Sequence, residues 1–221
     1  TVCHVKSLPQ APVDEAKLLF YDEVHGAAAE QRLRYLSSVT KAKFFGFTAS
    51  LGRLDRRDPT IEGLFGPVLF QMDYVRAKKE GFVSNLVVHI YDVPGAIPDS
   101  STYYKRQLYS IVRNATRNEL IAKVARKYSA NSVVIFAANN LEHVFRLHKL
   151  LPEFVPVYGT ASKARRAQLR RYNLIPDGYR FLFPGEEFVL AEKFRSGEIT
   201  KAISTNVWAG GVDLPSLEVI I

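Results

Sequence analysis

The chain has 221 residues, 47% of them apolar, which is enough for one large or two ordinary globular domains. Its 30 Lys and Arg outnumber its 22 Asp and Glu, and the net charge of +8 favours a polyanionic partner without identifying one. One cysteine excludes a disulfide framework or a cysteine-rich zinc site, and no signal peptide or membrane-length apolar run is present, so we expect a soluble cytoplasmic protein.

Both ends of the chain read as the interior of β-strands. The first is the stretch Thr1 to Val5, and the second is Val219 to Ile221. Native termini are usually polar and frayed. We therefore expect this sequence to be a part of a longer protein.

The first segment with clear chemistry is a predicted strand over residues 17–21. This strand is bulky and apolar, as is typical of a strand with helices on both faces, and it runs into Asp22, Glu23 and His25. Ligands collect at the carboxyl ends of such strands. Adjacent acids there suit a Mg²⁺-nucleotide site, with Asp22 near the metal and Glu23 accepting a proton from an attacking water. The alternative is a helix cap followed by a solvated turn.

A helix and a second strand follow the acids. Residues 26–36 are strong helix formers, and residues 42–47 predict a strand that ends in Thr48 and Ser50. Parallel neighbouring strands place their carboxyl ends about 4.8 Å apart. We therefore expect the two hydroxyls to hydrogen-bond the region of the acids and His25 and to sense the γ-phosphate. A helix cap is again the alternative.

A change of composition then marks a boundary. A Gly66-Pro67 turn precedes the polar stretch 77–84, so we place a first domain over residues 1–78 and a second over residues 79–221. An apolar, β-branched run predicts a strand over 86–91 that crosses into the second domain.

The second domain reads as alternating helices and strands. The predicted elements are a helical pair over 103–128, a buried strand over 131–137 with a capped helix after it, a short strand over 155–158 and a basic helix over 162–171. After this helix we expect a hairpin or loop over 172–189. Its alternating Tyr179, Phe181 and Phe183 either stack on bases or form the buried face of a strand.

Several of these segments resemble, in order, the motifs of superfamily 2 helicases. Asp22-Glu23-Val24-His25 resembles motif II, the DEAH-type box, and Thr48-Ala49-Ser50 resembles motif III. The strand and helix over 131–147 resemble motif IV. Thr205 to Pro215 resembles motif V, although Asn206 and Gly210 depart from its commonest pattern. The segment around Gly66-Pro67 is similar to that of the XPB-, RecG- and phage UvsW-like branch.

The resemblance implies an α/β fold of two RecA-like domains, with mostly parallel sheets covered by helices on both faces. It implies an ATP-dependent DNA helicase or translocase that remodels forked or branched DNA as the cleft between the domains opens and closes. The implied cofactors are ATP and Mg²⁺. The implied partner is nucleic acid, DNA rather than RNA, and no membrane, in the host cytoplasm for a phage-encoded protein.

The resemblance also assigns roles to residues. Its catalytic residues are Asp22, which holds Mg²⁺ through water, Glu23 and His25, and its coupling residues are Thr48 and Ser50. The residues implied to bind ATP are Gly211 and Asp213. The residues implied to bind nucleic acid are Lys6, Ser7, Gly159, Thr160, Arg165, Arg166, Thr205 and Asn206.

Two parts of this chemistry do not occur in the sequence, namely a Gly-x-x-x-x-Gly-Lys-Ser/Thr phosphate loop and the arginine-rich motif VI. We therefore expect these residues alone not to hydrolyse ATP. The alternatives are a catalytically incomplete double domain that serves as a nucleic-acid-binding module, a type III restriction translocase, or an RNA-directed DEAH protein.

Overall fold

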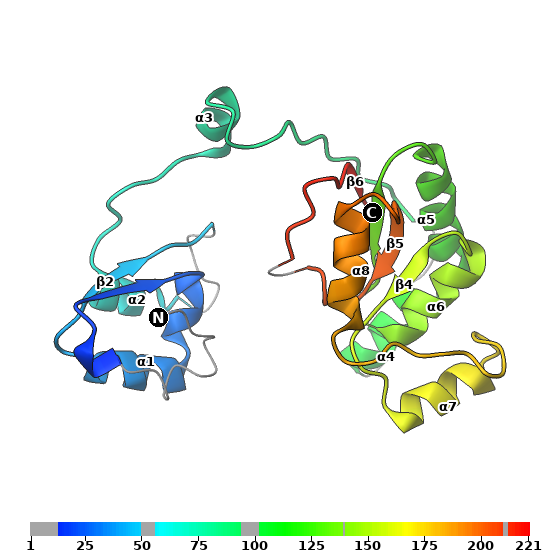
Figure 1. The fold of residues 1–221 in the computed structure, drawn as a ribbon, viewed down its shortest axis with the longest axis horizontal. Helices are drawn as coiled ribbons and strands as arrows, with labels where there is room; N and C mark the ends of the chain where they lie inside the picture. Colours follow the sequence, from blue (N-terminus) through cyan, green and yellow to red (C-terminus); the bar gives the residue numbers. More distant parts are fainter. Residues whose placement is uncertain (1–12, 50–55, 94–101, 139, 210–211) are drawn as a thin grey trace. The chain divides into compact units, whose positions relative to one another are not determined.

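The computed structural model describes residues 13–49, 56–93, 102–138, 140–209 and 212–221 (Figure 1). The chain divides into two compact units, unit 1 over Thr1–Val88 and unit 2 over His89–Ile221. Both units contain parallel strands flanked by helices, which confirms the predicted α/β class.

Unit 1 is built on a two-stranded parallel sheet. Strand β1 (Leu18–Tyr21) pairs with β2 (Lys43–Gly46), as the two predicted strands require. The ring of Phe65 packs edge-on against Tyr21 and Phe44, and the partly buried Phe44 and Phe65 cover the buried core that contains Tyr21, Val24 and Leu36. The helical elements of the described part of unit 1 are η2 (Val13–Glu15), η3 (Val24–Ala28), α1 (Glu30–Ser38), α2 (Asp58–Phe65) and α3 (Tyr74–Lys79).

The expectation that helices cover both faces of the first strand is wrong for the described residues. Tyr21 is buried, whereas Leu18 and Phe20 are 52% and 64% exposed. Phe20 stacks on exposed Phe45 and lies near exposed Phe47, with ring centroids 5.4 Å and 6.2 Å apart. Side chains alternate between the two faces of a strand, and the described helical elements pack on the face that carries Tyr21.

The predicted strand over 86–91 is also wrong. The described residues 84–93 form no helix or strand, and Leu86, Val88 and Ile90 are largely exposed. A β-strand requires a neighbour for its backbone hydrogen bonds, and no described strand pairs with this run. The high β-propensity of residues 86–91 is therefore not enough to make them form a strand.

Unit 2 contains a four-stranded, fully parallel sheet in the order β4-β5-β3-β6. Its strands are β3 (Val133–Phe136), β4 (Val155–Val157), β5 (Lys201–Ser204) and β6 (Val219–Ile220). Its described helical elements are α4 (Tyr103–Gln107), the π-helical turn η4 (Leu108–Val112), α5 (Ala115–Lys127), α6 (Leu141–Leu150), α7 (Lys163–Arg171) and α8 (Glu186–Arg195). The sequence did not predict α8, because its first turn falls inside the expected hairpin or loop.

Both faces of this sheet are covered. Val133 and Ile135 pack against α5 and α6, whereas Val134 between them packs against Phe194 of α8. The alternation along β3 thus places successive side chains in two separate cores. Unit 2 therefore matches the predicted architecture. Among the described residues, no helix has the length and apolar character to cross a membrane.

A buried carboxylate ties three helical elements of unit 2 together. Glu142, in the first turn of α6, is 3% exposed. It accepts hydrogen bonds from Arg113 Nε (2.7 Å) and Nη2 (3.0 Å) and from Arg146 Nε (2.8 Å). Arg113 also donates to Tyr172 Oη at 3.0 Å. Burial would raise the pKa of Glu142, but the hydrogen bonds from the two arginines outweigh it and lower that pKa.

A second buried polar chain starts from the neighbouring His143. The backbone N–H of Ala138 donates to His143 Nδ1 at 3.2 Å, so the proton of the neutral ring lies on Nε2. Nε2 donates to Asn118 Oδ1 at 3.0 Å, and Asn118 Nδ2 donates to Val112 O at 3.1 Å. The segment after β3 is thereby connected to α5 and to the π-helical turn η4.

We predict that unit 2 becomes less stable as the pH is lowered, because of His143. Burial, followed by the charges of Arg117 and Arg146, lowers the pKa of His143 from 6.5 to about 4. Between pH 6.5 and about pH 4 the unfolded chain binds a proton at His143 that the folded chain does not bind. The neutral, buried His143 therefore contributes its full stabilisation above pH 6.5, and this contribution is lost as the pH falls towards 4. The free energy of unfolding should be about 1 kcal/mol lower at pH 5.5 than at pH 7.5.

Urea unfolding followed by the fluorescence of Trp208, the single tryptophan, measures this difference in unit 2. His143→Gln should remove most of the pH dependence over this range, whereas His148→Gln, at a half-buried position on the same helix, should keep it. Equal slopes for His143→Gln and the parent would contradict the assignment.

Candidate functional site

The predicted acids lie at the carboxyl edge of the sheet of unit 1. The N–H of Phe47 donates to Tyr21 O, and Phe47 O accepts from the N–H of Val24, both at 2.9 Å. The parallel pairing therefore continues past both strand ends. Asp22 and Glu23 are exposed at this edge and accessible to a ligand.

His25 connects the acids to the end of β2. Its Nδ1 atom lies 3.0 Å from Thr48 Oγ1 and 3.2 Å from Glu23 Oε2. The structure thus brings together Glu23, His25 and Thr48, three of the residues singled out in the sequence. Ser50, the other predicted coupling hydroxyl, lies outside the described residues. The His25 side chain therefore links the Glu23 carboxylate directly to the segment that follows β2.

The backbone at Glu23 is unusual. Its φ of 51° and ψ of 51° fall in the left-handed region, which a non-glycine residue rarely adopts, and its N–H donates to Asp22 Oδ1 at 2.8 Å. The chain then turns sharply into η3. A Cβ atom at Gly46 would come within 2.7 Å of Val24 Cγ2, so glycine at the end of β2 allows this close approach.

A cavity of about 890 Å³ opens beside these residues within unit 1. Asp22, Glu23, His25 and Thr48 line it together with apolar side chains of β2 and α2. Its volume falls within the range of ligand pockets, roughly 300–1,000 Å³. The lining combines a few polar groups with a larger apolar wall, which is typical of small-molecule sites.

The donor set fits Mg²⁺ that arrives with a nucleotide. Among the described residues no group of three or more His, Cys, Asp or Glu could enclose a metal ion. Mg²⁺ is usually bound through one or two carboxylates, with phosphate oxygens and waters as its other ligands. Exposed Asp22 can supply one such carboxylate.

In unit 2 the predicted nucleic-acid residues also meet at one edge. The N–H of Thr205, directly after β5, donates to Val157 O at the end of β4 at 3.0 Å. Gly159 and Thr160 follow β4, and Asn206 follows Thr205, so all four predicted residues lie at neighbouring strand ends. Thr205 is buried, whereas Thr160 and Asn206 are exposed. Parallel pairing therefore brings these residues to one edge of the sheet.

The basic helix α7 begins beside this edge. Ser162 caps it by accepting from the N–H of Arg165 at 3.3 Å, and the Arg165 side chain is exposed. Arg166 donates from Nε to Ala161 O at 2.9 Å, and its guanidinium lies 4.8 Å from the centre of the Phe181 ring. Arg165 is thus the more accessible of the two predicted contacts, because Arg166 also serves the local structure.

The remaining predicted residues have mixed outcomes. Lys6, Ser7 and Gly211 lie outside the described residues, and Asp213 is exposed. Sequence reasoning did not single out Trp208, whose Nε1 donates to Glu187 O at 3.0 Å and whose side chain is buried. One feature of the sequence could have indicated this residue, because the chain's single tryptophan stands two residues before the pair Gly210-Gly211.

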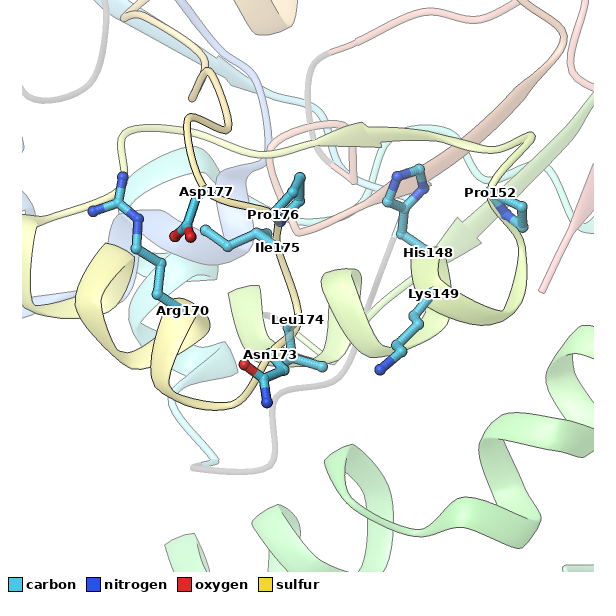
Figure 2. Close-up of a pocket in the computed structure, with 9 residues that line it drawn as sticks. All are labelled: His148, Lys149, Pro152, Arg170, Asn173, Leu174, Ile175, Pro176 and Asp177. Carbon is cyan, nitrogen blue, oxygen red and sulfur yellow. The ribbon is translucent and has the colours of Figure 1, made fainter.

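Figure 2 shows a second hollow, of about 450 Å³, in unit 2. It is lined by residues at the ends of α6 and α7 and in the segments that follow them: His148, Lys149, Pro152, Arg170, Asn173, Leu174, Ile175, Pro176 and Asp177. Pro152 precedes β4, so the hollow lies towards the amino end of that strand. None of the predicted site residues lines it.

Comparisons with known proteins point to helicases. No family model matches the chain. It is 27% identical over 164 residues to the General transcription and DNA repair factor IIH helicase/translocase subunit XPB1 of Arabidopsis thaliana, and 26% identical to subunit XPB2 of the same plant. Each alignment covers 69% of this chain and 21% of the relative, so the chain spans about a fifth of the length of these relatives.

Among solved structures, the Mycobacterium smegmatis helicase Lhr bound to ssDNA and AMP-PNP matches with a TM-score of 0.46 and 18% identity. That match covers 98% of this chain and 26% of the Lhr chain. The two relatives matched in sequence are both helicase/translocase subunits. Over 69% of its length, the chain is therefore similar to a part of two helicase/translocase subunits.

Proposed function

We propose that this chain is the part of an ATP-dependent DNA helicase or translocase that carries the acids of the ATPase site and a nucleic-acid-binding edge. The observation that carries the proposal is the bridge from Glu23 through His25 to Thr48 beside a nucleotide-sized cavity. A helix cap explains neither the cavity nor the contact between two strand ends.

Asp22 and the three residues of the bridge have distinct roles. Asp22 would hold the Mg²⁺ that accompanies ATP, and that ion would neutralise charge on the phosphates. Glu23 is the general base that accepts a proton from the attacking water. His25 orients the Glu23 carboxylate, and Thr48, with Ser50, couples its position to β2. Neither hydroxyl activates water or binds metal in this scheme.

The backbone at Glu23 supports a functional role for this residue. A non-glycine residue in the left-handed region costs roughly 1–2 kcal/mol. Such strain concentrates at active sites, where a side chain must take a fixed direction. The cost at Glu23 is therefore consistent with selection for the carboxylate and its position.

In unit 2, Gly159, Thr160, Thr205 and Asn206 would contact the nucleic-acid backbone, and Gly211 and Asp213 would contact ATP. The adjacent basic helix α7 adds charge for phosphate binding. ATP-driven opening and closing of the two domains would then remodel forked or branched DNA. Lys6 and Ser7 complete the proposed nucleic-acid contacts.

A second candidate is a nucleic-acid-binding module without ATP turnover. The sequence contains no Gly-x-x-x-x-Gly-Lys-Ser/Thr phosphate loop, and that observation favours the module for these residues taken alone. A full-length polypeptide with a phosphate loop would favour the enzyme. Steady-state ATP turnover by that polypeptide separates the two functions.

Glu23→Gln in the full-length polypeptide should lower ATP turnover by about 10²–10⁴-fold and leave ATP and DNA binding largely unchanged. The amide keeps the size of the side chain but is a poor proton acceptor. Steady-state turnover and equilibrium binding measure the two effects. Glu30→Gln, at an exposed acid of α1, is the matched control. Turnover of Glu23→Gln within about threefold of the parent would reject the general-base role.

Glu23→Gly should stabilise unit 1 by about 0.5–1 kcal/mol while abolishing turnover, because glycine adopts the left-handed region without steric cost. Hydrogen exchange of amides in β1 and β2 measures the stability of this region. Asn173, in unit 2, has a φ of 50°, and Asn173→Gly is the control that should leave turnover intact. Faster exchange in Glu23→Gly would show that the backbone there is not strained.

Affinity for labelled forked DNA should fall log-linearly with salt concentration, as expected for phosphate binding. Arg165→Gln should weaken binding and reduce the magnitude of the salt slope by about one. Arg34→Gln, which removes an exposed charge from α1 of unit 1, should change neither quantity. A salt-independent affinity would exclude α7 as a phosphate-binding surface.

A further inference from the structure

The segment between α7 and α8 is anchored at one end on the residue that follows β4. The N–H of Leu182 donates to Tyr158 Oη at 3.3 Å. Phe181 is buried and meets the Tyr158 ring edge-on at 6.5 Å between centroids, and Tyr179 meets Phe181 at 5.2 Å. Phe181 is therefore a core residue and the partly buried Tyr179 packs against it, and together they fix this segment beside Tyr158.

The other end of the segment is anchored on the loop after β5. The carbonyl of Glu187, in the first turn of α8, accepts from Trp208 Nε1 at 3.0 Å. Trp208 is buried and lies two residues after Asn206 in the sequence. The stretch from Leu182 to Glu187 thus runs between the ends of β4 and β5, along the edge that carries the proposed nucleic-acid contacts.

Two aromatic rings point away from the core, one within this stretch and one on the residue directly after it. Phe183 is 63% exposed, and Phe188 is 61% exposed. The guanidinium of Arg180 lies 5.2 Å from the centre of the Phe183 ring. The Phe183 N–H donates to Glu186 Oε2 at 2.8 Å, so the backbone that presents this ring is fixed. Neither ring contributes to the described clusters of the core.

The nearby acids are engaged locally. Glu186 pairs with Arg180 and accepts the Phe183 N–H, and Glu187 Oε2 accepts the N–H of Gly185 at 3.0 Å. Both carboxylates therefore serve the start of α8, where negative charge is favourable. Helix α7, which precedes the segment, carries five basic residues and no acid.

We propose that Phe183 and Phe188 stack on the bases of a single strand of nucleic acid that follows the carboxyl edge of unit 2. This inference rests on the proposed function, because that function supplies the strand whose phosphates lie at Thr160, Thr205 and α7. Exposed aromatic rings beside a basic surface bind single strands without sequence preference. A duplex keeps the faces of its bases stacked internally, so the expected ligand is a single strand.

The test compares binding to labelled oligothymidine and to an abasic strand of the same length, by fluorescence anisotropy. The double variant Phe183→Leu/Phe188→Leu keeps apolar side chains and removes both rings. Its affinity for oligothymidine should fall about tenfold or more, because each stacked base contributes roughly 1–3 kcal/mol. Its affinity for the abasic strand and its salt slope should match the parent, because both depend on phosphates.

Two controls separate stacking from a loss of structure. Phe183→Tyr/Phe188→Tyr keeps both rings and should bind like the parent. Phe20→Leu/Phe82→Leu removes two exposed rings of unit 1 that do not line its cavity, and this variant should also bind like the parent. Trp208 fluorescence reports whether each variant retains the fold of unit 2.

The outcomes distinguish this inference from the proposed function. A parent that binds both strands equally, or a leucine variant with parental affinity for oligothymidine, overturns the stacking inference while salt-dependent binding still supports the proposed function. Weak binding by the tyrosine variant also overturns it. A parent that binds neither strand overturns both.

Discussion

Parallel strand pairing is the constraint on which both candidate sites depend. Because neighbouring strands run in the same direction, the residues that follow them lie at one edge of each sheet. In unit 1 this places His25 Nδ1 within 3.0 Å of Thr48 Oγ1. In unit 2 it places Thr205 beside Val157, two residues before Gly159. An antiparallel pair would send these residues to opposite ends of the sheet.

The edge of unit 2 is held in place by buried polar groups. Glu142 of α6 accepts from Arg146 on the same helix and from Arg113, which follows the π-helical turn η4. The Val112 carbonyl of that turn accepts from Asn118. His143 completes the link to the residues after β3. Removal of one partner from a buried ion pair leaves an uncompensated charge, which costs about 3–5 kcal/mol. The network therefore connects the residues that follow β3 to α5, α6 and η4.

The sequence predicted the elements that local patterns determine. Apolar runs beside turn residues predicted the two strands of unit 1 and strands β3, β4 and β6 of unit 2. Helix-permissive runs, one of them strongly basic, predicted helices α5, α6 and α7. The contact between His25 and Thr48 followed from strand adjacency. Patterns could not predict that the run 86–91 would lack a strand partner. They also could not predict the left-handed backbone at Glu23, since the positions of η3 and β2 determine it.

The three aromatics after α7 show why a pattern of period two can mislead. Tyr179 and Phe181 both pack against the ring of Phe145, so they share a core although no strand forms there. The turn in which Glu186 accepts the Phe183 N–H then changes the direction of the chain and leaves Phe183 outside. From the sequence, the three rings could either stack on nucleic-acid bases or form the buried face of a strand. The structure divides the same three rings between a buried anchor and an exposed surface.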